Sequence, residues 1–559
     1  MTDSISDTNE TLTQLLSNVE NNFGDSVALD LLHDLGAHPV DLDTGQPPEV
    51  SYNNDQQNHI IVVGAGIAGL TLAYELAERG ANVELWEASS RAGGRNLTVR
   101  RGDIINEIGQ EKQVCNLPTG SYFNAGPGRI SHHHRAVLHY CRKFNLGLRP
   151  YLTLNRASFL HRWIPGLDKD IVIRNRQVEF DGLGQLGELA AKSEAWLNPD
   201  DPLSSELKTT CQDWLRDRCD IHFSDESGQN IGIDAATGEE YYINDKKKVS
   251  GKYQGSGRQG YAAYRGDRNH PGRTIQSLSL EQILSLRLWY DDPRRSPDTI
   301  DEQISMFELE NGNDSLVNAF VNALGEKIVL RRKLEEVKKV ETGGVILRGI
   351  DHSDRDAQTQ FEIKADRVIL ALQPQAMEGM SLDLPADRLQ GLKSLPARFA
   401  VKVGGWMARR FWEEDDAIYG GISFTNLPIQ QIWYPNDRYM DPSGGFLVLA
   451  YAALKHGEAL GNLSTTQRMK AAVTMASRIH PQIKQELDES SLITIAWQNM
   501  PYIRSPWVAW TPELYKRWFP LLSEPCGPIA FAGDWCSHLP AWQEGSIRSA
   551  YSLLQWALN

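Results

Sequence analysis

The pattern of hydrophobic and polar positions changes character at residue 59. The first fifty-odd residues are polar, with one short helical candidate at 27–36 followed by a stretch rich in helix breakers. From His59 onward the chain runs through the apolar segment IIVV, a glycine-rich turn, the amphipathic segment LTLAYELAERG and a second apolar segment, ANVELWEAS. This order predicts strand, turn, helix and strand, the βαβ opening of a dinucleotide-binding domain.

The glycine-rich turn reads Gly64-Ala65-Gly66-Ile67-Ala68-Gly69. Glycines at these places permit a tight turn and let the backbone approach a pyrophosphate at the N-terminus of the following helix. Glu87 ends the second strand, about 20 residues further on, where an acid accepts hydrogen bonds from a ribose hydroxyl pair. A bound dinucleotide is therefore expected to contact Gly64, Gly66, Ala68, Gly69 and Glu87.

Later apolar segments at 327–342, 365–372 and 528–535 are candidates for further strands of this lobe. The pattern predicts an α/β fold in which a Rossmann-like nucleotide-binding lobe is interleaved with an α+β substrate-binding lobe that carries a helical insertion. The expected parts are an N-terminal extension at 1–57, nucleotide-binding segments at 58–120, 305–372 and 521–559, and substrate-binding segments at 121–304 and 373–520.

Residues 205–275 are the least regular part of the chain and are rich in loop signals. Two interpretations stay open, a solvated surface insertion and a mobile lid over the entrance to an active site.

Composition narrows the class of partner. The chain of 559 residues has 57 Lys and Arg against 72 Asp and Glu, a formal net charge of −15, which argues against a nucleic-acid partner. The six cysteines lack the spacing of a zinc site or a disulfide framework, so we expect free or buried thiols, no metal and a reducing compartment. Without a secretory signal pattern or a membrane-spanning apolar segment, a soluble cytoplasmic protein with no membrane partner is expected.

Two further segments indicate a flavin rather than a nicotinamide. EASSRAGGR (87–95) resembles the continuation of the nucleotide motif in the flavin amine oxidase superfamily, whose last arginine, here Arg95, lies near the flavin phosphates. PIAFAGDW (528–535) resembles that superfamily's closing strand, whose acid, here Asp534, reaches a cofactor hydroxyl. The resemblance implies non-covalent FAD, because no cysteine or histidine stands in a known flavin-linking context. The cofactor contacts it implies are Gly64, Gly66, Ala68, Gly69, Glu87, Arg95, Gly126, Pro127, Gly128, Arg129, Val337, Gly533, Asp534, Trp542 and Gln543.

Within that superfamily the chain resembles the L-amino-acid oxidases. The resemblance is carried by YFNAGPGRISHHHRAVLHYCRKFNLGL (122–148), RRFWEEDDAIYGGISFTNLP (409–428) and IWYPNDR (432–438). In that family the arginine of a Gly-Pro-x-Arg element forks onto the substrate carboxylate, a role that maps onto Arg129. A planar, permanently charged guanidinium suits bidentate binding of a carboxylate, although an ion pair that braces the next helix is the alternative.

Other family positions map onto the C-terminal half. Tyr451 corresponds to a second carboxylate contact, with aromatic packing as the alternative, and Trp542 to the aromatic side chain beside the reacting amino group. Ala541 would offer a backbone carbonyl to the amine, although the animal pattern has glycine there. Lys402, ten residues before Trp412, corresponds to a catalytic lysine that holds a water against the flavin. Burying an isolated lysine is costly, which also favours a function for Lys402.

The triple histidine at 132–134 suggests a metal or base site, but a simpler interpretation is favoured. Ser131 is a plausible helix N-cap, and consecutive helical positions point in different directions. We therefore expect ordinary histidines in the first turn of a helix, of which only His134 coincides with a family position.

The resemblance implies oxidative deamination of an L-amino acid to the 2-oxo acid, ammonia and hydrogen peroxide, with molecular oxygen as acceptor and a homodimer as the assembly. L-Arginine or another basic amino acid is the favoured substrate. The aromatic-rich segment 496–512, residues 535–538 and the central insertion are expected to line the pocket. An aromatic substrate stays open, because an aromatic-rich lining would stack on either kind of side chain.

Three alternatives to this function remain. One is a flavin monooxygenase of the tryptophan 2-monooxygenase type, which releases carbon dioxide and an amide instead of peroxide. An amine or polyamine oxidase would have no use for an arginine that binds a carboxylate. The non-enzymatic alternative is a binding protein on the same fold, similar to the prenyl-protein dissociation inhibitors, and a colourless protein would favour it.

Overall fold

The computed structural model describes residues 44–50, 58–193, 278–288, 306–352 and 358–559, together with six short strands between 221 and 274. The chain divides into two compact units, Met1–Gln46 and Pro47–Asn559, and the fold below is that of the second. The helix expected at 27–36 and most of the insertion expected at 205–275 lie outside the described residues.

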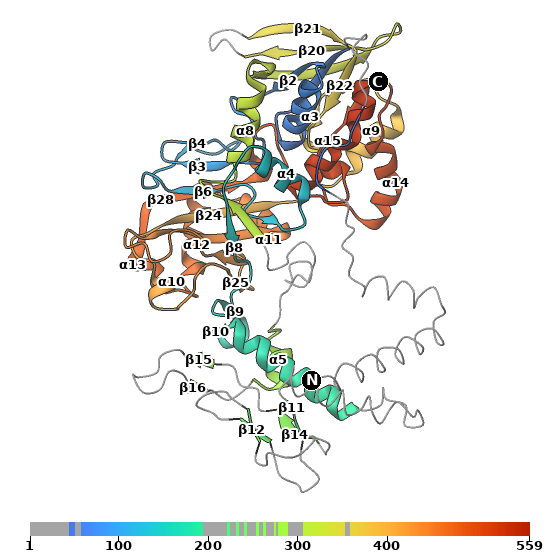
Figure 1. The fold of residues 1–559 in the computed structure, drawn as a ribbon. Coiled ribbons are helices and arrows are strands. Elements are labelled where there is room, and N and C mark those ends of the chain that lie inside the picture. The colour runs from blue at the N-terminus through green and yellow to red at the C-terminus, as the bar shows by residue number, and fades with distance from the viewer. Residues whose placement is uncertain are drawn as a thin grey trace, which may run out of the picture. The chain divides into compact units, whose positions relative to one another are not determined.

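A five-stranded parallel sheet forms the centre of the lobe that the sequence predicts to bind a nucleotide (Figure 1). Its strand order is β18 (Ile328–Leu330), β2 (Asn82–Glu87), β1 (His59–Val63), β22 (Arg367–Leu370) and β29 (Ile529–Phe531). The three later apolar segments of the sequence each contribute one strand, since strands covered on both faces appear as continuous apolar runs. The α/β class expected from the sequence is confirmed, whereas the exact boundaries of the segments stay a prediction.

Four helices cover one face of this sheet. They are α3 (Ile67–Glu78), α4 (Arg135–Lys143), α8 (Ser315–Leu324) and α15 (Gln543–Leu558), which share one apolar core. Side chains alternate along β1, so that Ile60 and Val62 belong to this core while Ile61 and Val63 belong to the core on the opposite face.

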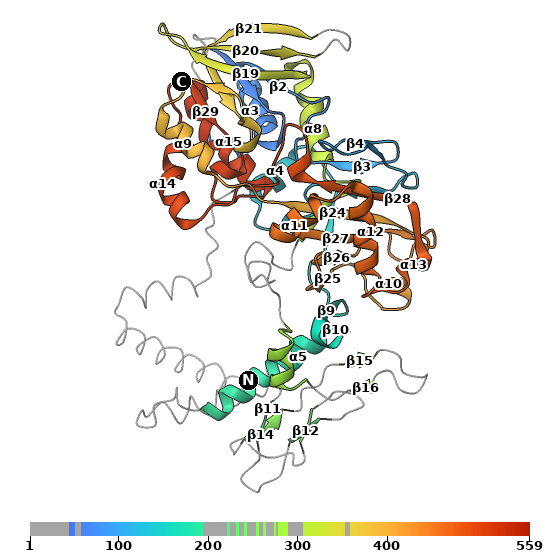
Figure 2. The same cartoon turned by 180° about the vertical axis from the view of Figure 1, so that it is seen from behind.

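An antiparallel sheet and two helices cover the opposite face. The sheet has the order β21 (Thr359–Ala365), β20 (Val345–Asp351), β19 (Arg332–Lys339) and β23 (Ser381–Leu382), with β23 parallel to β19. The helices are α9 (Ala386–Ser394) and α14 (Pro512–Ser523). Both Figure 1 and Figure 2 show β20 and β21 beyond β2, at the margin of this lobe.

The second lobe, which the sequence predicts to bind the substrate, is built on a seven-stranded mixed sheet (Figure 2). Its order is β10 (Lys169–Arg174), β9 (Phe159–Ile164), β25 (Ile422–Thr425), β26 (Gln431–Trp433), β27 (Gly445–Ala453), β24 (Ala400–Met407) and β28 (Leu487–Ala496). Helices α11 (Leu454–Gly461) and α12 (Thr465–Ala476) pack on β24 and β27. Every residue of β24 is buried, so the strand lies in the interior of the lobe.

Smaller sheets and helices complete the described chain. One sheet joins β7 (Ile130–Ser131), β17 (Met306–Leu309) and β8 (Leu148–Tyr151), and two pairs join β3 (Thr98–Arg100) with β6 (Tyr122–Asn124) and β4 (Ile104–Ile105) with β5 (Gln113–Val114). Three further pairs join β11 (Ile221–Phe223) with β14 (Tyr253–Ser256), β12 (Ile231–Ile233) with β13 (Glu240–Tyr242), and β15 (Tyr261–Ala263) with β16 (Arg273–Thr274). The remaining helices are α5 (Asn175–Ser193), α7 (Leu280–Ser285), α10 (Phe411–Glu414) and α13 (Ile483–Glu486).

The described cysteines are free thiols, as expected, at positions 115, 141, 526 and 536. Burial raises the pKa of Cys141 to about 12, so this thiol stays protonated at neutral pH. In the part of the chain that the structure describes, no helix is both long and apolar enough to cross a membrane.

Candidate functional site

A cavity of about 840 Å³ is lined by residues of both lobes. Among the described residues that line it, Glu87 carries the only carboxylate, whereas the basic side chains are Arg91, Arg95, Arg129, Arg331, Arg398 and Lys402. A chain with a net charge of −15 therefore encloses a cationic cavity. Such a cavity favours ligands that carry phosphate or carboxylate groups.

The glycine turn has the shape that a bound dinucleotide requires. Gly64 has φ +101°, and a Cβ atom on Gly69 would lie 1.9 Å from the carbonyl oxygen of Gly64, so neither position tolerates a side chain without a backbone shift. Gly66 is different, because a Cβ atom there would meet no atom within 4 Å. The space in front of the α3 N-terminus is thus open to a phosphate.

Glu87 is well placed for the ribose contact expected of it. Its side chain ends β2 at the cavity and accepts hydrogen bonds from the backbone N–H groups of Ala65 (2.9 Å) and Ser89 (2.8 Å). These bonds hold the carboxylate in one orientation without using all of its acceptor capacity. The glycine turn and Glu87 together fit a dinucleotide such as FAD.

Arg95 and Asp534 form an ion pair at the cavity. Arg95 donates from Nη1 to Asp534 Oδ2 over 3.2 Å, and Nη2 makes a second contact with Oδ1. Asp534 is 1% exposed and also accepts from Gln373 Nε2 (2.8 Å) and from the N–H of Ala541 (2.7 Å). Arg95 lines the cavity while Asp534 lies behind it, so a contact between Asp534 and a cofactor hydroxyl stays a prediction.

Most of the predicted cofactor residues line this cavity, and three do not: Gly69, Val337 and Asp534. Val337 lies on β19 and is 1% exposed, because its side chain packs into the core beneath the parallel sheet. Arg331 and His352 line the cavity from this part of the chain instead. The sequence did not indicate these two residues, because Arg331 lies between β18 and β19 and His352 follows β20, and no motif marks either position.

The half of the cavity predicted to bind the substrate brings Arg129, Lys402, Tyr451 and Trp542 together with Trp433. The guanidinium carbon of Arg129 lies 5.5 Å from the ring centre of Trp433 and 5.7 Å from that of Trp542. The Nζ atom of Lys402 lies 4.6 Å from the same Trp433 ring and 5.6 Å from the ring of Tyr451. Aromatic faces stabilise cations without neutralising them by an opposite charge, so the positive potential of this region is retained.

Trp433 is a site residue that the sequence reasoning missed. It lies within the segment IWYPNDR, but nothing in the sequence showed that its ring would face both cations. A signal was present at Gly128, where a Cβ atom would lie 2.6 Å from the Trp433 ring. Glycine at this position leaves the space that the indole occupies.

Lys402 is buried in β24, with 4% of its surface exposed. Its ammonium donates to the carbonyl oxygens of Asn124 (3.0 Å) and Gly126 (2.6 Å). Burial, with a smaller contribution from the charge of Arg129, lowers the pKa of Lys402 to about 7. Near neutral pH this side chain can therefore hold or release a proton inside the cavity.

The expectation for the triple histidine is wrong. Helix α4 begins only at Arg135, and Ser131 lies in β7, so the histidines precede the helix rather than forming its first turn. His134 lines the cavity with its ring edge-on to Trp542, at 4.8 Å between ring centres. Burial, aided by the neighbouring histidines and by arginines 129 and 548, lowers the pKa of His134 to about 3, which keeps the ring neutral.

Ala541 lines the cavity beside Trp542 and adopts a left-handed backbone conformation, with φ +72°. Alanine is strained there, whereas glycine is not. The N–H bond to Asp534 helps to hold Ala541 in this conformation.

The aromatic-rich segment was interpreted correctly only in part. From 496–512, the lining residues are Trp497, Met500, Pro501, Tyr502, Ile503, Pro506 and Trp507. Residues 535–538 are not part of the wall, contrary to expectation. Trp535 is 0% exposed and donates from Nε1 to the carbonyl of Leu372 (2.9 Å), since its ring fills the core below the parallel sheet.

Comparison with known proteins agrees with this geometry. The chain is 25% identical over 500 residues to an L-amino-acid oxidase of Notechis scutatus scutatus, covering 88% of this chain and 85% of that protein. It is 26% identical over 501 residues to an L-amino-acid oxidase of Bungarus fasciatus, with the same two shares covered.

Solved structures give the same fold. A putrescine oxidase bound to putrescine matches with a TM-score of 0.54 and 19% identity, over 89% of this chain and 98% of that one. Cyclohexylamine oxidase from Brevibacterium oxydans matches with a TM-score of 0.54 and 17% identity, over 90% and 99%. The model of the family described as "Flavin containing amine oxidoreductase" matches residues 67–552. The chain therefore belongs to the family of flavin-containing amine oxidoreductases, as a flavoenzyme with FAD as its cofactor.

Proposed function

We propose that this enzyme oxidises an L-amino acid to the 2-oxo acid, with release of ammonia and hydrogen peroxide. The observation that carries the proposal is the placement of Arg129 and Lys402 around the shared Trp433 ring, in a cavity half without a carboxylate among its described lining residues. Two cations there attract the carboxylate of an amino acid. A simple amine, itself a cation, would be repelled, so a carboxylate-free substrate fits less well.

The residues divide into a cofactor set and a substrate set. The cofactor set is the glycine turn with Glu87, Arg95 and the segment 126–128. When bound, FAD supplies the acceptor for the hydride of the substrate Cα and returns the electrons to molecular oxygen. Arg129 and Tyr451 would bind the substrate carboxylate, and the carbonyl of Ala541 would accept a hydrogen bond from the amine beside Trp542. Orientation of this kind supplies much of the rate enhancement in such a reaction.

Lys402 is proposed to act on the oxygen half of the reaction. Its ammonium places a positive charge at the cavity wall, where reduction of oxygen develops negative charge. The carbonyl oxygens of Asn124 and Gly126 orient the ammonium. With a pKa near 7, the same group can also exchange a proton with a water molecule in the cavity.

L-Arginine, or another basic amino acid, is the proposed substrate. Support comes from the aromatic side chains of the wall, Trp433, Trp497, Trp507, Tyr451 and Tyr502, whose faces can bind a guanidinium. An aromatic L-amino acid is the second candidate. A buried substrate guanidinium normally requires an anionic partner. Glu87, the only carboxylate among the described lining residues, lies on the nucleotide side of the cavity, away from the proposed substrate side, and this favours an uncharged aromatic side chain. The homodimer is proposed on the family resemblance alone.

The test is a peroxide and ammonia assay of the FAD-loaded enzyme with L-arginine, L-lysine, L-citrulline, L-tryptophan and L-phenylalanine. L-Arginine is expected to lead, and citrulline, which has nearly the same shape without the charge, to have a kcat/KM about 100-fold lower, the factor expected from losing about 2–3 kcal/mol of charge-assisted contacts.

A ranking led by tryptophan or phenylalanine would replace the proposed substrate and leave the oxidase in place. Carbon dioxide with an amide product would show a monooxygenase, and turnover of putrescine but of no amino acid would contradict the carboxylate clamp. No turnover of any of these compounds by the yellow holoenzyme would remove the proposal.

A further inference from the structure

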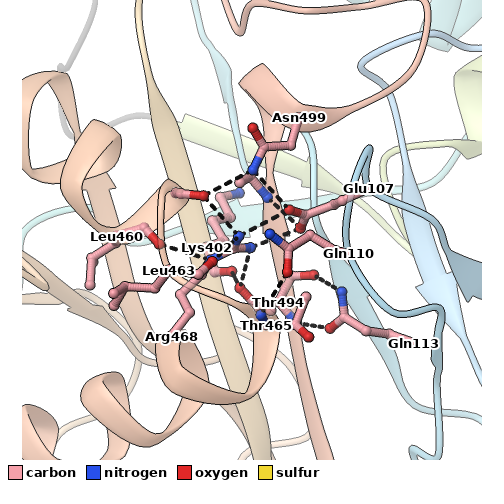
Figure 3. A network of polar contacts seen from close by, with 12 residues as sticks. Glu107, Gln110, Gln113, Lys402, Leu460, Leu463, Thr465, Arg468, Thr494 and Asn499 are labelled. Carbon is pink, nitrogen blue, oxygen red and sulfur yellow. Dashed lines mark hydrogen bonds and ion pairs between the residues drawn. The ribbon is translucent and has the colours of Figure 1, made fainter.

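A buried ion pair lies next to one wall of the cavity, between Glu107, which follows β4, and Arg468 of α12 (Figure 3). Both side chains are 0% exposed. The pair is bidentate, with Arg468 Nη1 donating to Oε1 over 2.8 Å and Nη2 donating to Oε2 over 3.0 Å. Burying two charges is costly unless their remaining hydrogen-bonding groups are satisfied.

Those remaining groups bind the backbone and side chains of two other segments. Arg468 also donates to the carbonyl oxygens of Leu460, Gly461 and Leu463, over 3.0–3.3 Å. Glu107 also accepts from the N–H of Ala496 (2.9 Å) and from Asn499 Nδ2 (3.3 Å). The pair therefore joins the loop after β4, the end of α11 and the turn after β28. These segments are far apart in the sequence.

Each joined segment also supplies part of the cavity wall. Ile104 and Asn106 come just before Glu107, Leu454 begins α11, and residues 497 and 500–503 follow β28, and all of them line the cavity. The N–H of Ile108 donates to the carbonyl of Asn499 (2.8 Å), which adds a direct bond between two of the segments. The ion pair is thus a shared anchor of a composite wall.

The anchor also reaches Lys402. The hydroxyl of Thr494 donates to the carbonyl oxygen of Lys402 (2.9 Å) and accepts from Arg468 Nη1 (3.4 Å). The backbone N–H and carbonyl of Thr494 are both bonded to the side chain of Gln113, at 3.0 Å each. Figure 3 shows these side chains converging on the strand that carries Lys402.

We infer that Glu107 and Arg468 are positioning residues of the substrate site. The pair fixes the wall formed by residues 104, 106, 454, 497 and 500–503, and through Thr494 it holds β24 so that Lys402 keeps its place. Leu454 and Tyr502 in this wall have left-handed φ angles of +56° and +63°. Such conformations persist only where the surroundings enforce them. Neither Glu107 nor Arg468 lines the cavity, so their action is indirect.

The test separates positioning from stability. In the double variant Glu107→Leu/Arg468→Met both charges are removed together, because apolar replacement of a buried ion pair usually preserves folding while removal of one partner does not. The matched control is Arg410→Met/Glu413→Leu, which removes a second buried pair (2% exposed each) whose residues do not line the cavity. Both variants are compared with the native holoenzyme by hydrogen–deuterium exchange and by kcat/KM for the best amino acid.

In the Glu107/Arg468 variant, residues 496–503 are expected to exchange about tenfold faster or more, and kcat/KM to fall about tenfold or more, with native-like values in the control. Native exchange and native kcat/KM in the first variant would overturn the inference. An equal loss in the control would overturn it too, since the effect would then be one of general stability.

Thr494→Val serves if the double variant does not fold, because it removes a single hydroxyl at nearly constant size. In Thr494→Val, the midpoint of the pH dependence of turnover, which we assign to the titration of Lys402, is expected to move by about 0.5 unit or more. The control is Thr474→Val, on the exposed side of α12, which is expected to leave this midpoint unchanged. An unchanged midpoint would contradict the role of the anchor. Only the kinetic measurements, kcat/KM and the pH midpoint, rest on the proposed function. If the native enzyme oxidises no amino acid, the proposed function is refuted. Hydrogen–deuterium exchange of residues 496–503 still decides the positioning role in that case.

Discussion

The two halves of the cavity differ in the groups that surround their basic side chains. On the nucleotide side, Arg95 is paired with the buried carboxylate of Asp534. On the substrate side, the ammonium of Lys402 lies among backbone carbonyls and the rings of Trp433 and Tyr451. An ion pair orients a cation but cancels most of its field, whereas carbonyls and aromatic rings orient it and leave the field in place. Arg95 thus adds little net field to the nucleotide side, where the glycine turn provides the shape, whereas Lys402 keeps its field on the proposed substrate side.

Gly69→Ala tests the shape of the nucleotide side and has the largest expected effect. The new Cβ atom would lie 1.9 Å from the carbonyl oxygen of Gly64, so the turn must move. We expect FAD affinity to fall by about 3 kcal/mol, roughly 150-fold, measured by flavin titration of the apoprotein. Gly182→Ala, in a helix with no atom within 4 Å of the new Cβ, is the control and should bind FAD normally.

Arg129→Lys tests whether the substrate side needs a fork as well as a charge. The variant should keep its flavin and lose about 2–3 kcal/mol in kcat/KM, because one ammonium cannot reproduce two parallel hydrogen bonds to a carboxylate. Steady-state kinetics with the best amino acid, together with the flavin absorbance, measures both quantities. Equal efficiency in the two proteins would remove the carboxylate role of Arg129.

Lys402→Met tests the field directly. Flavin reoxidation by oxygen should slow by about 1–2 kcal/mol, more than anaerobic reduction does, in stopped-flow experiments. The opposite order would assign Lys402 to the reductive half.

The same variant makes a prediction about stability and pH. The pKa of Lys402 is lowered from 10.5 to about 7, so between these values the unfolded chain binds a proton that the native protein has released. Stability should therefore rise with pH across this window, and the cost of burying the charge is fully present below pH 7. Lys402→Met should remove that contribution, which urea unfolding at pH 7 and pH 10 would reveal as a smaller pH dependence than in the native protein.

Ala541→Gly has the smallest expected effect and tests the junction of the two halves. Glycine relieves the left-handed strain at φ +72° but adds freedom to the unfolded chain, so stability should change by less than about 1 kcal/mol. The carbonyl proposed to bind the amine remains, and kcat/KM should stay within about threefold of native. A loss as large as that of Arg129→Lys would show that the methyl group itself shapes the substrate site.

The nucleotide half was predictable because its determinants are local. A glycine turn between a strand and a helix constrains its own backbone, and Glu87 ends the next strand of the same βαβ unit, so spacing along the chain is enough to locate them. The cofactor contact that the resemblance implies for Val337 stays a prediction, and in this structure its strand joins an antiparallel sheet and its side chain enters the core. Ser131 shows a limit of local reasoning, since a favourable capping residue did not start the helix.

By itself the sequence determined the α/β class and the glycine turn, and it predicted, without deciding, which residues bind a flavin and a carboxylate. Only the tertiary structure decided that Trp433 lies between Arg129 and Lys402, that the carbonyls of Asn124 and Gly126 receive the ammonium of Lys402, and that Glu107 reaches Arg468 across 361 residues of sequence. These contacts join segments that share no local pattern. Periodicity and spacing report which face of its own element a residue occupies, whereas the partner on the other side is set by how separate sheets and loops pack.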